Sequence, residues 1–282
     1  RSKNFGMIGA AFGLGFIIGP VIGGLLGQFG SRVPFYAAAV LCLVNFAYGY
    51  FILPESLGKE HRRPFEWKRA NPVGSLLKVR THPEILKLFI AWFLVYLASH
   101  AVQTNWAYFT MYKFAWDEKT VGISLGVMGA FTAFVQGFLI RKVHPKLGSE
   151  RSILYGIMFY CTGMLLFAFA QKEWMMYAIL AIYCLGGIAG PALQSVISSK
   201  VSPKEQGDLQ GALTSVISIT SIIGPLLMTQ IFYFFTHPDA KIKLLTLELK
   251  PPFQFSGAPF FLGFVLMAVS AYFVYYVFHR KK

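Results

Sequence analysis

The sequence predicts an all-α membrane protein, a bundle of apolar helices that cross a lipid bilayer. Of its 282 residues, 55% are hydrophobic and only 13% carry a charge. A soluble domain has about 25% charged residues, so a surface this poor in charge needs lipid as part of its solvent. Length is the third observation, because eight apolar stretches reach the roughly 20 residues that a helix needs to cross a bilayer.

The predicted spans contain no Asp, Glu or Arg. Lys87 lies in the first turn of the third span, where its long side chain can reach the membrane interface. In chain order, the eight spans cover residues 5–27, 34–53, 85–109, 121–140, 152–170, 174–198, 212–235 and 258–278.

The loops alternate in positive charge, and this predicts the orientation. Of the 26 Lys and Arg, 19 fall on the side of the two chain ends and 7 on the other side. Cytoplasmic loops carry the excess of positive charge, so we expect both ends of the chain in the cytoplasm and the protein in the plasma membrane, the inner membrane of a bacterium. The net charge of +14 does not indicate a nucleic-acid partner, because the basic residues are spread over short loops instead of one face or tail.

A repeat and a long loop predict the domain organisation. Gly6, Gly19 and Pro20 recur 205 residues later as Gly211, Gly224 and Pro225, so the first span corresponds to the seventh. Transporters are built from such repeated halves, and two units of six spans give twelve, of which eight are here. We therefore expect the last two helices of an N-terminal bundle in 1–53, a polar cytoplasmic linker in 54–84 and a complete C-terminal six-helix bundle in 85–282, with partner helices of the same chain missing from the front.

The first span carries a spaced motif, Gly15-Phe16-Ile17-Ile18-Gly19-Pro20-Val21-Ile22-Gly23-Gly24. It resembles the antiporter motif G-x-x-x-G-P-x-x-G-G on the fifth span of drug:proton antiporters of the major facilitator superfamily. Other segments resemble the tetracycline-efflux branch, namely Leu53-Pro54-Glu55-Ser56, Asn71-Pro72, Trp116-Asp117, Val121-Gly122-Ile123-Ser124-Leu125, Gly190-Pro191-Ala192-Leu193-Gln194, Gln206-Gly207 with Leu209-Gln210-Gly211, and Ile223-Gly224-Pro225-Leu226-Leu227. The resemblance implies the superfamily's helical bundle, spans five to twelve of it, and proton-coupled export of amphipathic drugs.

The motif also has a physical interpretation. Gly15, Gly19 and Gly23 are four residues apart, so they form a flat stripe on which another helix can pack closely, and Gly24 adjoins it. Pro20 removes a helical hydrogen bond and kinks the span. A kinked, closely packed pair can seal one side of a transporter, although the stripe also fits ordinary helix packing.

The short loop from Arg141 to Arg151 resembles a second motif of the superfamily, in which basic residues cap helix carbonyls and pair with an acid. Arg141, Gly148 and Arg151 are its candidate residues, and Glu150 is the candidate acid. Plain anchoring of positive charge in the cytoplasm is the alternative.

Proton coupling needs a titratable group in the membrane, and the eight spans offer no carboxylate. The tetracycline branch carries a His and an Asp on its eighth and ninth spans, and Thr132 and Tyr160 hold those places here. His100 is the one ionisable group in mid-span and the proton-coupling candidate. The alternative is a neutral His that is hydrogen-bonded to another helix.

Polar and aromatic residues in mid-span are candidates for a substrate cavity, because such residues avoid lipid and transporter sites lie near the bilayer midplane. Each could instead bond to a neighbouring helix. The candidates are Asn45, Trp92, Tyr96, His100, Gln103, Thr132, Gln136, Tyr160, Gln194 and Gln230.

No nucleotide, cofactor or nucleophile motif is present, so an enzyme is not expected. Cys42, Cys161 and Cys184 lie singly in apolar runs, which predicts no metal site. The sequence thus predicts a secondary transporter that exports a small amphipathic solute with protons as the coupling ion. A carrier for another solute, or a membrane partner or sensor that transports nothing, is the alternative.

Overall fold

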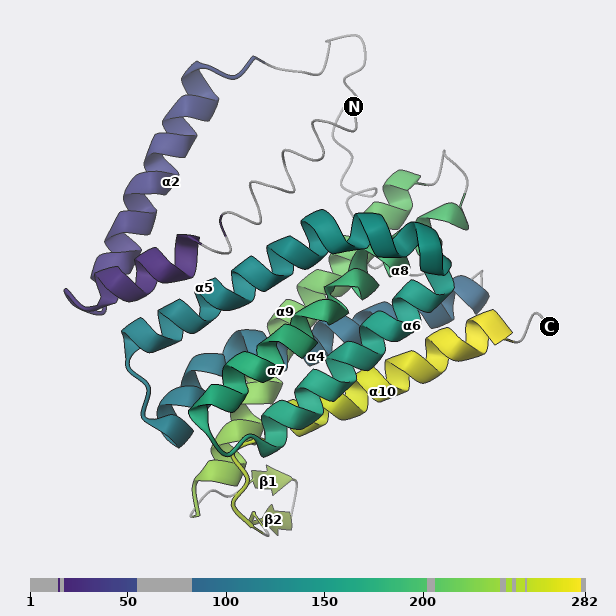
Figure 1. Cartoon of the computed structure of the whole chain (residues 1–282). Coiled ribbons are helices and arrows are strands. Elements are labelled where there is room, and N and C mark those ends of the chain that lie inside the picture. The colour runs from purple at the N-terminus through teal and green to yellow at the C-terminus, as the bar shows by residue number, and fades with distance from the viewer. Residues whose placement is uncertain are drawn as a thin grey trace.

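The computed structural model describes residues 15, 18–54, 83–201, 206–238, 242–244, 247–251 and 253–279. Most of the predicted linker 54–84 and the start of the predicted first span lie outside these residues. Helices dominate the described chain (Figure 1). They are a short helix Ile18–Gly27, α2 (Val33–Phe51), α4 (Pro83–Phe114), α5 (Glu118–Phe134), the π-helical η2 (Val135–Leu139), α6 (Ile140–Phe169), α7 (Glu173–Leu185), the 3-10 turn η3 (Gly186–Ile188), α8 (Ala189–Ser199), α9 (Gln206–Thr236) and α10 (Ala258–His279).

These helices confirm the predicted all-α membrane fold. Each predicted span coincides with a helix or a joined run of helices within the described residues, and α7, η3 and α8 together form the span predicted at 174–198. Asp117 precedes α5 as its N-cap, and its Oδ1 accepts a hydrogen bond from the Thr120 amide at 2.8 Å. Hydrogen bonding from Thr120 lowers the pKa of this exposed carboxyl, so the charged form caps the helix.

The loop predicted between spans 121–140 and 152–170 is largely helical instead. The helix runs on from α5 through η2 into α6, and the chain reverses at Gly148, where φ is 74° and ψ 172°. Glycine takes a positive φ without a steric penalty, so the reversal falls there. Charged residues do not end a helix, and Pro145 lies inside it close to the reversal.

The helices from α4 onward pack into one bundle (Figure 1). α10 lies against α4 and α6, α4 against α9, α6 against α7 and α8, and α5 against α7. The core has two apolar clusters along the bundle. The first cluster includes Leu88, Ile157 and Leu193, and the second includes Trp106, Phe167 and Phe260.

Two features stand outside this bundle. α2 has no buried residue, and Figure 1 shows it apart from the helices of the bundle. Strands β1 (Ile242–Leu244) and β2 (Leu247–Leu249) form an antiparallel hairpin between α9 and α10, with Ile242 opposite Leu249. The spacing of apolar residues did not predict this hairpin, which leaves the all-α bundle unchanged.

Candidate functional site

The motif helix Ile18–Gly27 crosses α5 with its backbone almost in contact. A Cβ added to Gly24 would lie 3.0 Å from the Gly122 Cα, and one added to Gly122 would lie 2.8 Å from the Pro20 carbonyl oxygen. Gly15, Gly19 and Gly23, the predicted stripe, have nothing within 4 Å of such a Cβ. Pro20 and Gly24, one helical turn apart, therefore make the close approach among the described residues.

The second copy of the Gly-Pro motif packs on the candidate histidine. Gly224 of α9 lies against the imidazole of His100 on α4, and an added Cβ would come within 2.5 Å of the His100 Cγ. His100 is only 7% exposed. The alternative interpretation of His100 was a neutral ring that is hydrogen-bonded to another helix. No described residue makes a hydrogen bond to either ring nitrogen of His100.

His100 marks the level at which the two apolar clusters meet, since Ala98 belongs to the first and Ala101 to the second. Tyr160 packs against both clusters and so lies at the same level. We call the side chains gathered here the central layer. Its members are Tyr96 and His100 of α4, Thr132 of α5, Tyr160 of α6, and Tyr183 and Cys184 of α7.

Tyr160 lies at the core of this layer, between α6 and α7. Its ring centroid is 4.8 Å from that of Tyr183, and its ring covers Gly186, where an added Cβ would lie 2.5 Å from the Cγ. Gly186 begins the 3-10 turn between α7 and α8, and its lack of a side chain leaves room for the Tyr160 ring. The hydroxyls of Tyr160 and Tyr183 have no hydrogen bond within the described residues, so both remain able to bind a solute or water.

Thr132 of α5 contacts α7, the helix that carries Tyr183. Its hydroxyl lies 3.6 Å from the Cys184 Sγ, which in turn lies 3.7 Å from the Met128 carbonyl oxygen. One turn along, the Gln136 amide lies 3.6 Å from the position of a Cβ on Gly187. The two places where the tetracycline branch carries a His and an Asp therefore converge on residues 183–187 of this chain.

The remaining cavity candidates are exposed or bonded to other polar side chains. Asn45 is exposed on α2, and Gln230 is exposed on α9. The Gln103 amide donates to the Ser99 hydroxyl at 3.0 Å within α4. The Gln194 amide donates to the Gln210 side-chain oxygen at 3.2 Å, and this bond joins α8 to α9. Gln194 therefore has the bond to a neighbouring helix that was the alternative to a place in the cavity.

Comparison with known proteins decides the family. The family profile described as Major Facilitator Superfamily matches residues 1–225. The chain belongs to the major facilitator superfamily. Members of this superfamily are transporters, which confirms that the chain is not an enzyme.

Individual relatives place it near the tetracycline-efflux branch of the superfamily. The chain is 37% identical over 232 residues to the class C tetracycline resistance protein of Escherichia coli, covering 82% of this chain and 58% of the relative. It is 35% identical over 232 residues to the class G protein of Vibrio anguillarum, covering 82% and 59%. The chain thus spans somewhat more than half the length of these relatives.

A solved superfamily structure shows the same fold. The human organic anion transporter MFSD10 (TETRAN) matches with a TM-score of 0.69 and 21% identity, covering 97% of this chain and 63% of that chain. At this level of sequence identity, the match shows a shared fold only. The superfamily match and the long apolar helices together make the chain a multi-pass membrane protein.

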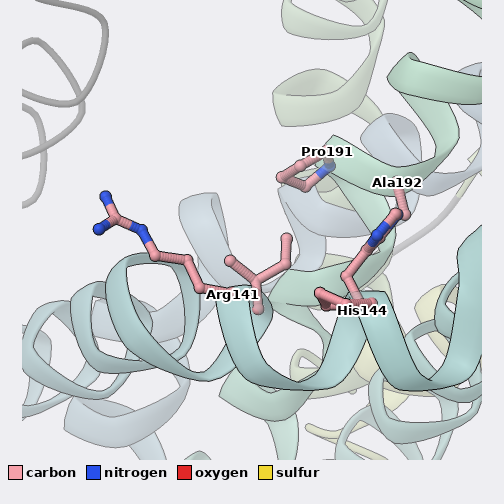
Figure 2. Close-up of a pocket in the computed structure, with 6 residues that line it drawn as sticks. Arg141, His144, Pro191 and Ala192 are labelled. Atoms are coloured by element: carbon pink, nitrogen blue, oxygen red, sulfur yellow. The ribbon is translucent and has the colours of Figure 1, made fainter. Parts of the chain in front are cut away.

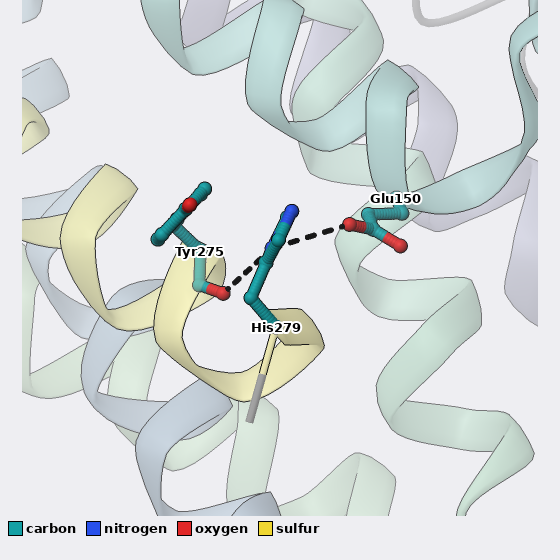
Figure 3. A network of polar contacts seen from close by, with 3 residues as sticks. All are labelled: Glu150, Tyr275 and His279. Atoms are coloured by element: carbon teal, nitrogen blue, oxygen red, sulfur yellow. Dashed lines mark hydrogen bonds and ion pairs between the residues drawn. The ribbon is translucent and has the colours of Figure 1, made fainter. Parts of the chain in front are cut away.

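The superfamily's loop motif adds contacts at one end of the bundle. Gly148 makes the reversal described above, and Arg141 and Arg151 are exposed on either side of it. Glu150, the expected acid, lies 3.5 Å from the Nδ1 of His279 in the last turn of α10 (Figure 3). The same nitrogen lies 3.2 Å from the Tyr275 carbonyl oxygen. Glu150 thus ties the loop to α10 when His279 is protonated.

Sequence reasoning did not select Tyr183 or Asn105. Tyr183 was hidden in a continuously apolar span. Asn105 is fully buried with neither amide atom bonded within the described residues. The Nε1 of Trp92, one of the predicted cavity candidates, is also buried without a partner there. Asn105 is a polar residue in mid-span, and this was the available signal for it.

Proposed function

We propose that the whole protein exports an amphipathic, drug-like solute of the tetracycline type by alternating access, with protons as the coupling ion. The relatives are named for tetracycline resistance. The observation that carries the proposal is the crossing of Ile18–Gly27 over α5, with Gly24 and Gly122 backbones in near contact. Two helices that touch backbone to backbone exclude water between them, as a seal on one side of a rocking transporter must.

The crossing also supports the proposed organisation of the chain. We infer that 1–53 supplies the last two helices of an N-terminal bundle, that 54–84 links the bundles and that 85–282 forms the C-terminal bundle. The crossing would then join the two halves. α2, which has no buried residue, would pack on further helices of the N-terminal half.

The central layer is the proposed solute site. It offers aromatic rings and unbonded hydroxyls, as on Tyr160 and Tyr183, without any carboxylate. Aromatic faces suit a flat apolar solute, and hydroxyls supply donors and acceptors at no cost in buried charge. A carrier for another solute remains the second candidate, because Thr132 and Tyr160 replace the titratable pair of the tetracycline branch.

The seal is tested with two glycines of the same helix. Gly24→Ala places a methyl 3.0 Å from backbone atoms of α5, whereas Gly27→Ala meets only the Glu118 Cβ at 3.9 Å. In cells that express the whole protein, we expect Gly24→Ala to raise tetracycline accumulation toward that of cells without the protein. Gly27→Ala should keep export. Equal export by both variants would contradict a seal at this crossing.

The solute and the coupling ion are tested separately. Export of tetracycline by the unmodified protein separates the drug exporter from a carrier of other solutes, and a phenotype that is independent of any solute favours the partner or sensor. His100→Gln keeps the size and polarity of the side chain but does not titrate. We expect it to flatten the dependence of transport on pH, and an unchanged pH profile would remove His100 from proton coupling.

The location is part of the same proposal. We propose the inner membrane of a bacterium, with both ends of the chain in the cytoplasm. Single cysteines at Lys172 and at Lys146, introduced into a variant that lacks the native cysteines, should differ in labelling of intact cells. A membrane-impermeant maleimide should reach position 172 and not position 146.

A further inference from the structure

A cavity of about 300 Å³ lies between α6 and α8, close to the reversal at Gly148. Pro145, Pro191 and Ala192 line it with short side chains. Its walls are apolar apart from one arginine and one histidine (Figure 2). The lining residues are Ile140, Arg141, His144, Pro145, Pro191 and Ala192.

The two polar lining residues are both donors. Arg141 is exposed, and no acid in the described part of the chain pairs with it. The Nε2 of His144 lies 3.4 Å from the Ser149 hydroxyl. When that hydroxyl donates to Nε2, the Nδ1 of His144 carries the proton and can donate to a ligand. Figure 2 shows the His144 ring beside Ala192, whereas the Arg141 guanidinium points away from these residues toward the surroundings of the cavity.

The surroundings of the cavity are strongly positive. Lys142 and Lys146 are exposed on the same segment of α6. The one acid between Arg141 and Arg151 is Glu150, and His279 lies 3.5 Å from it. An anion at the cavity would therefore meet cations and hydrogen-bond donors, and the one acid of this segment already faces His279.

An apolar strip leads away from the charged rim along the same helical run. The Lys142 ammonium sits 4.4 Å over the Phe138 ring, and Phe138 stacks on Phe134 at 5.5 Å between centroids. These rings are 50% and 55% exposed. A lysine that lies over an exposed ring in this way marks the boundary between apolar surface and water.

We propose that this cavity binds the phosphate group of an anionic phospholipid. A guanidinium matches phosphate oxygens with two parallel hydrogen bonds, and basic pockets between membrane helices bind lipid headgroups. The strip formed by Phe134 and Phe138 gives an acyl chain an apolar surface beside the headgroup. A free phosphate has the same headgroup chemistry but no use for the strip, so the strip favours the lipid as the source.

The test is native mass spectrometry of the full chain in detergent, titrated with dioleoylphosphatidylglycerol or dioleoylphosphatidylcholine. The unmodified chain should bind the anionic lipid more tightly. Arg141→Gln should weaken this binding by about tenfold, the usual effect of removing a charge-assisted hydrogen bond. Arg151→Gln is the matched control, since it removes the same charge from an exposed arginine of α6 that does not line the cavity.

A second variant keeps the charges and fills the space. Ala192→Leu should weaken binding of phosphatidylglycerol as Arg141→Gln does, and a thermal melt followed by tryptophan fluorescence verifies that each variant is folded. If Arg151→Gln weakens binding as much as Arg141→Gln, or if folded Ala192→Leu binds normally, diffuse surface charge explains the binding and the site is wrong.

Inorganic phosphate identifies the source of the ligand. If millimolar phosphate displaces phosphatidylglycerol from the unmodified chain but not from Arg141→Gln, the cavity recognises the phosphate group and free phosphate is a sufficient ligand. If phosphate displaces nothing while the selectivity for phosphatidylglycerol depends on Arg141, the lipid is the ligand. The absence of any selectivity between the two lipids would overturn the proposal.

Discussion

Replacing Gly224 with alanine probes the contact on which the central layer depends. The added methyl would lie 2.5 Å from the His100 Cγ and 2.9 Å from its Cβ. Because the Cβ is fixed to the α4 backbone, turning the ring cannot relieve the clash. α4 and α9 must therefore separate slightly along the face where they pack.

The expected cost follows from two opposing effects. Overpacking of a tight core costs about 1–3 kcal/mol, and the upper end applies because His100 is only 7% exposed. Alanine regains roughly 1 kcal/mol over glycine inside a helix. The net loss is about 2 kcal/mol, and for a chain of this size it lowers the melting temperature by about 4–8 °C.

The measurement is a thermal melt of the purified chain in detergent. Gly207→Ala is the control on the same helix, since an added Cβ there has nothing within 4 Å, and it should not lower the melting temperature. In a His100→Gly background, which removes both the ring and the Cβ, the methyl of Gly224→Ala meets neither, so the substitution should become stabilising. The same loss with and without His100 would refute the contact, because residues that do not touch show additive effects.

Three further substitutions test other contacts. The Trp106 indole N–H donates to the Ser124 hydroxyl at 2.8 Å in the core. Ser124→Ala leaves this N–H without a partner and should destabilise the chain by about 1–3 kcal/mol in the same melt. No loss of stability would mean that water replaces the hydroxyl. Asp117→Ala should lower the melting temperature at pH 7 more than Asp117→Asn does. The pKa of Asp117 is lowered in the fold. Its contribution to stability is therefore present above the ordinary pKa of the carboxyl and disappears as the pH falls through the lowered value. Equal melting temperatures of the alanine variant and the unmodified chain at pH 7 would contradict the cap. Glu150→Gln should change stability by less than about 0.5 kcal/mol, because surface ion pairs contribute little and both side chains of the pair with His279 are more than 40% exposed; a larger loss would show that this contact holds α10 in place.

The sequence by itself determined which segments form helices and that they lie in lipid. Hydropathy and length are local properties, so every predicted span coincides with a helix in the described part of the chain. The spaced motif on the first span was enough to suggest the superfamily that the comparison established. The helical continuation from Arg141 to the reversal at Gly148 was missed, because a positively charged segment has the composition of a loop and can still be helical.

Only the tertiary structure decided which side chains meet. The spacing of Gly15, Gly19 and Gly23 predicted a packing stripe, but the close approach falls on Gly24, one position further around the helix. Nor could the sequence place His100 on Gly224, 124 residues away. Helical periodicity specifies which residues share a face, whereas the partner of that face depends on how all the helices pack together.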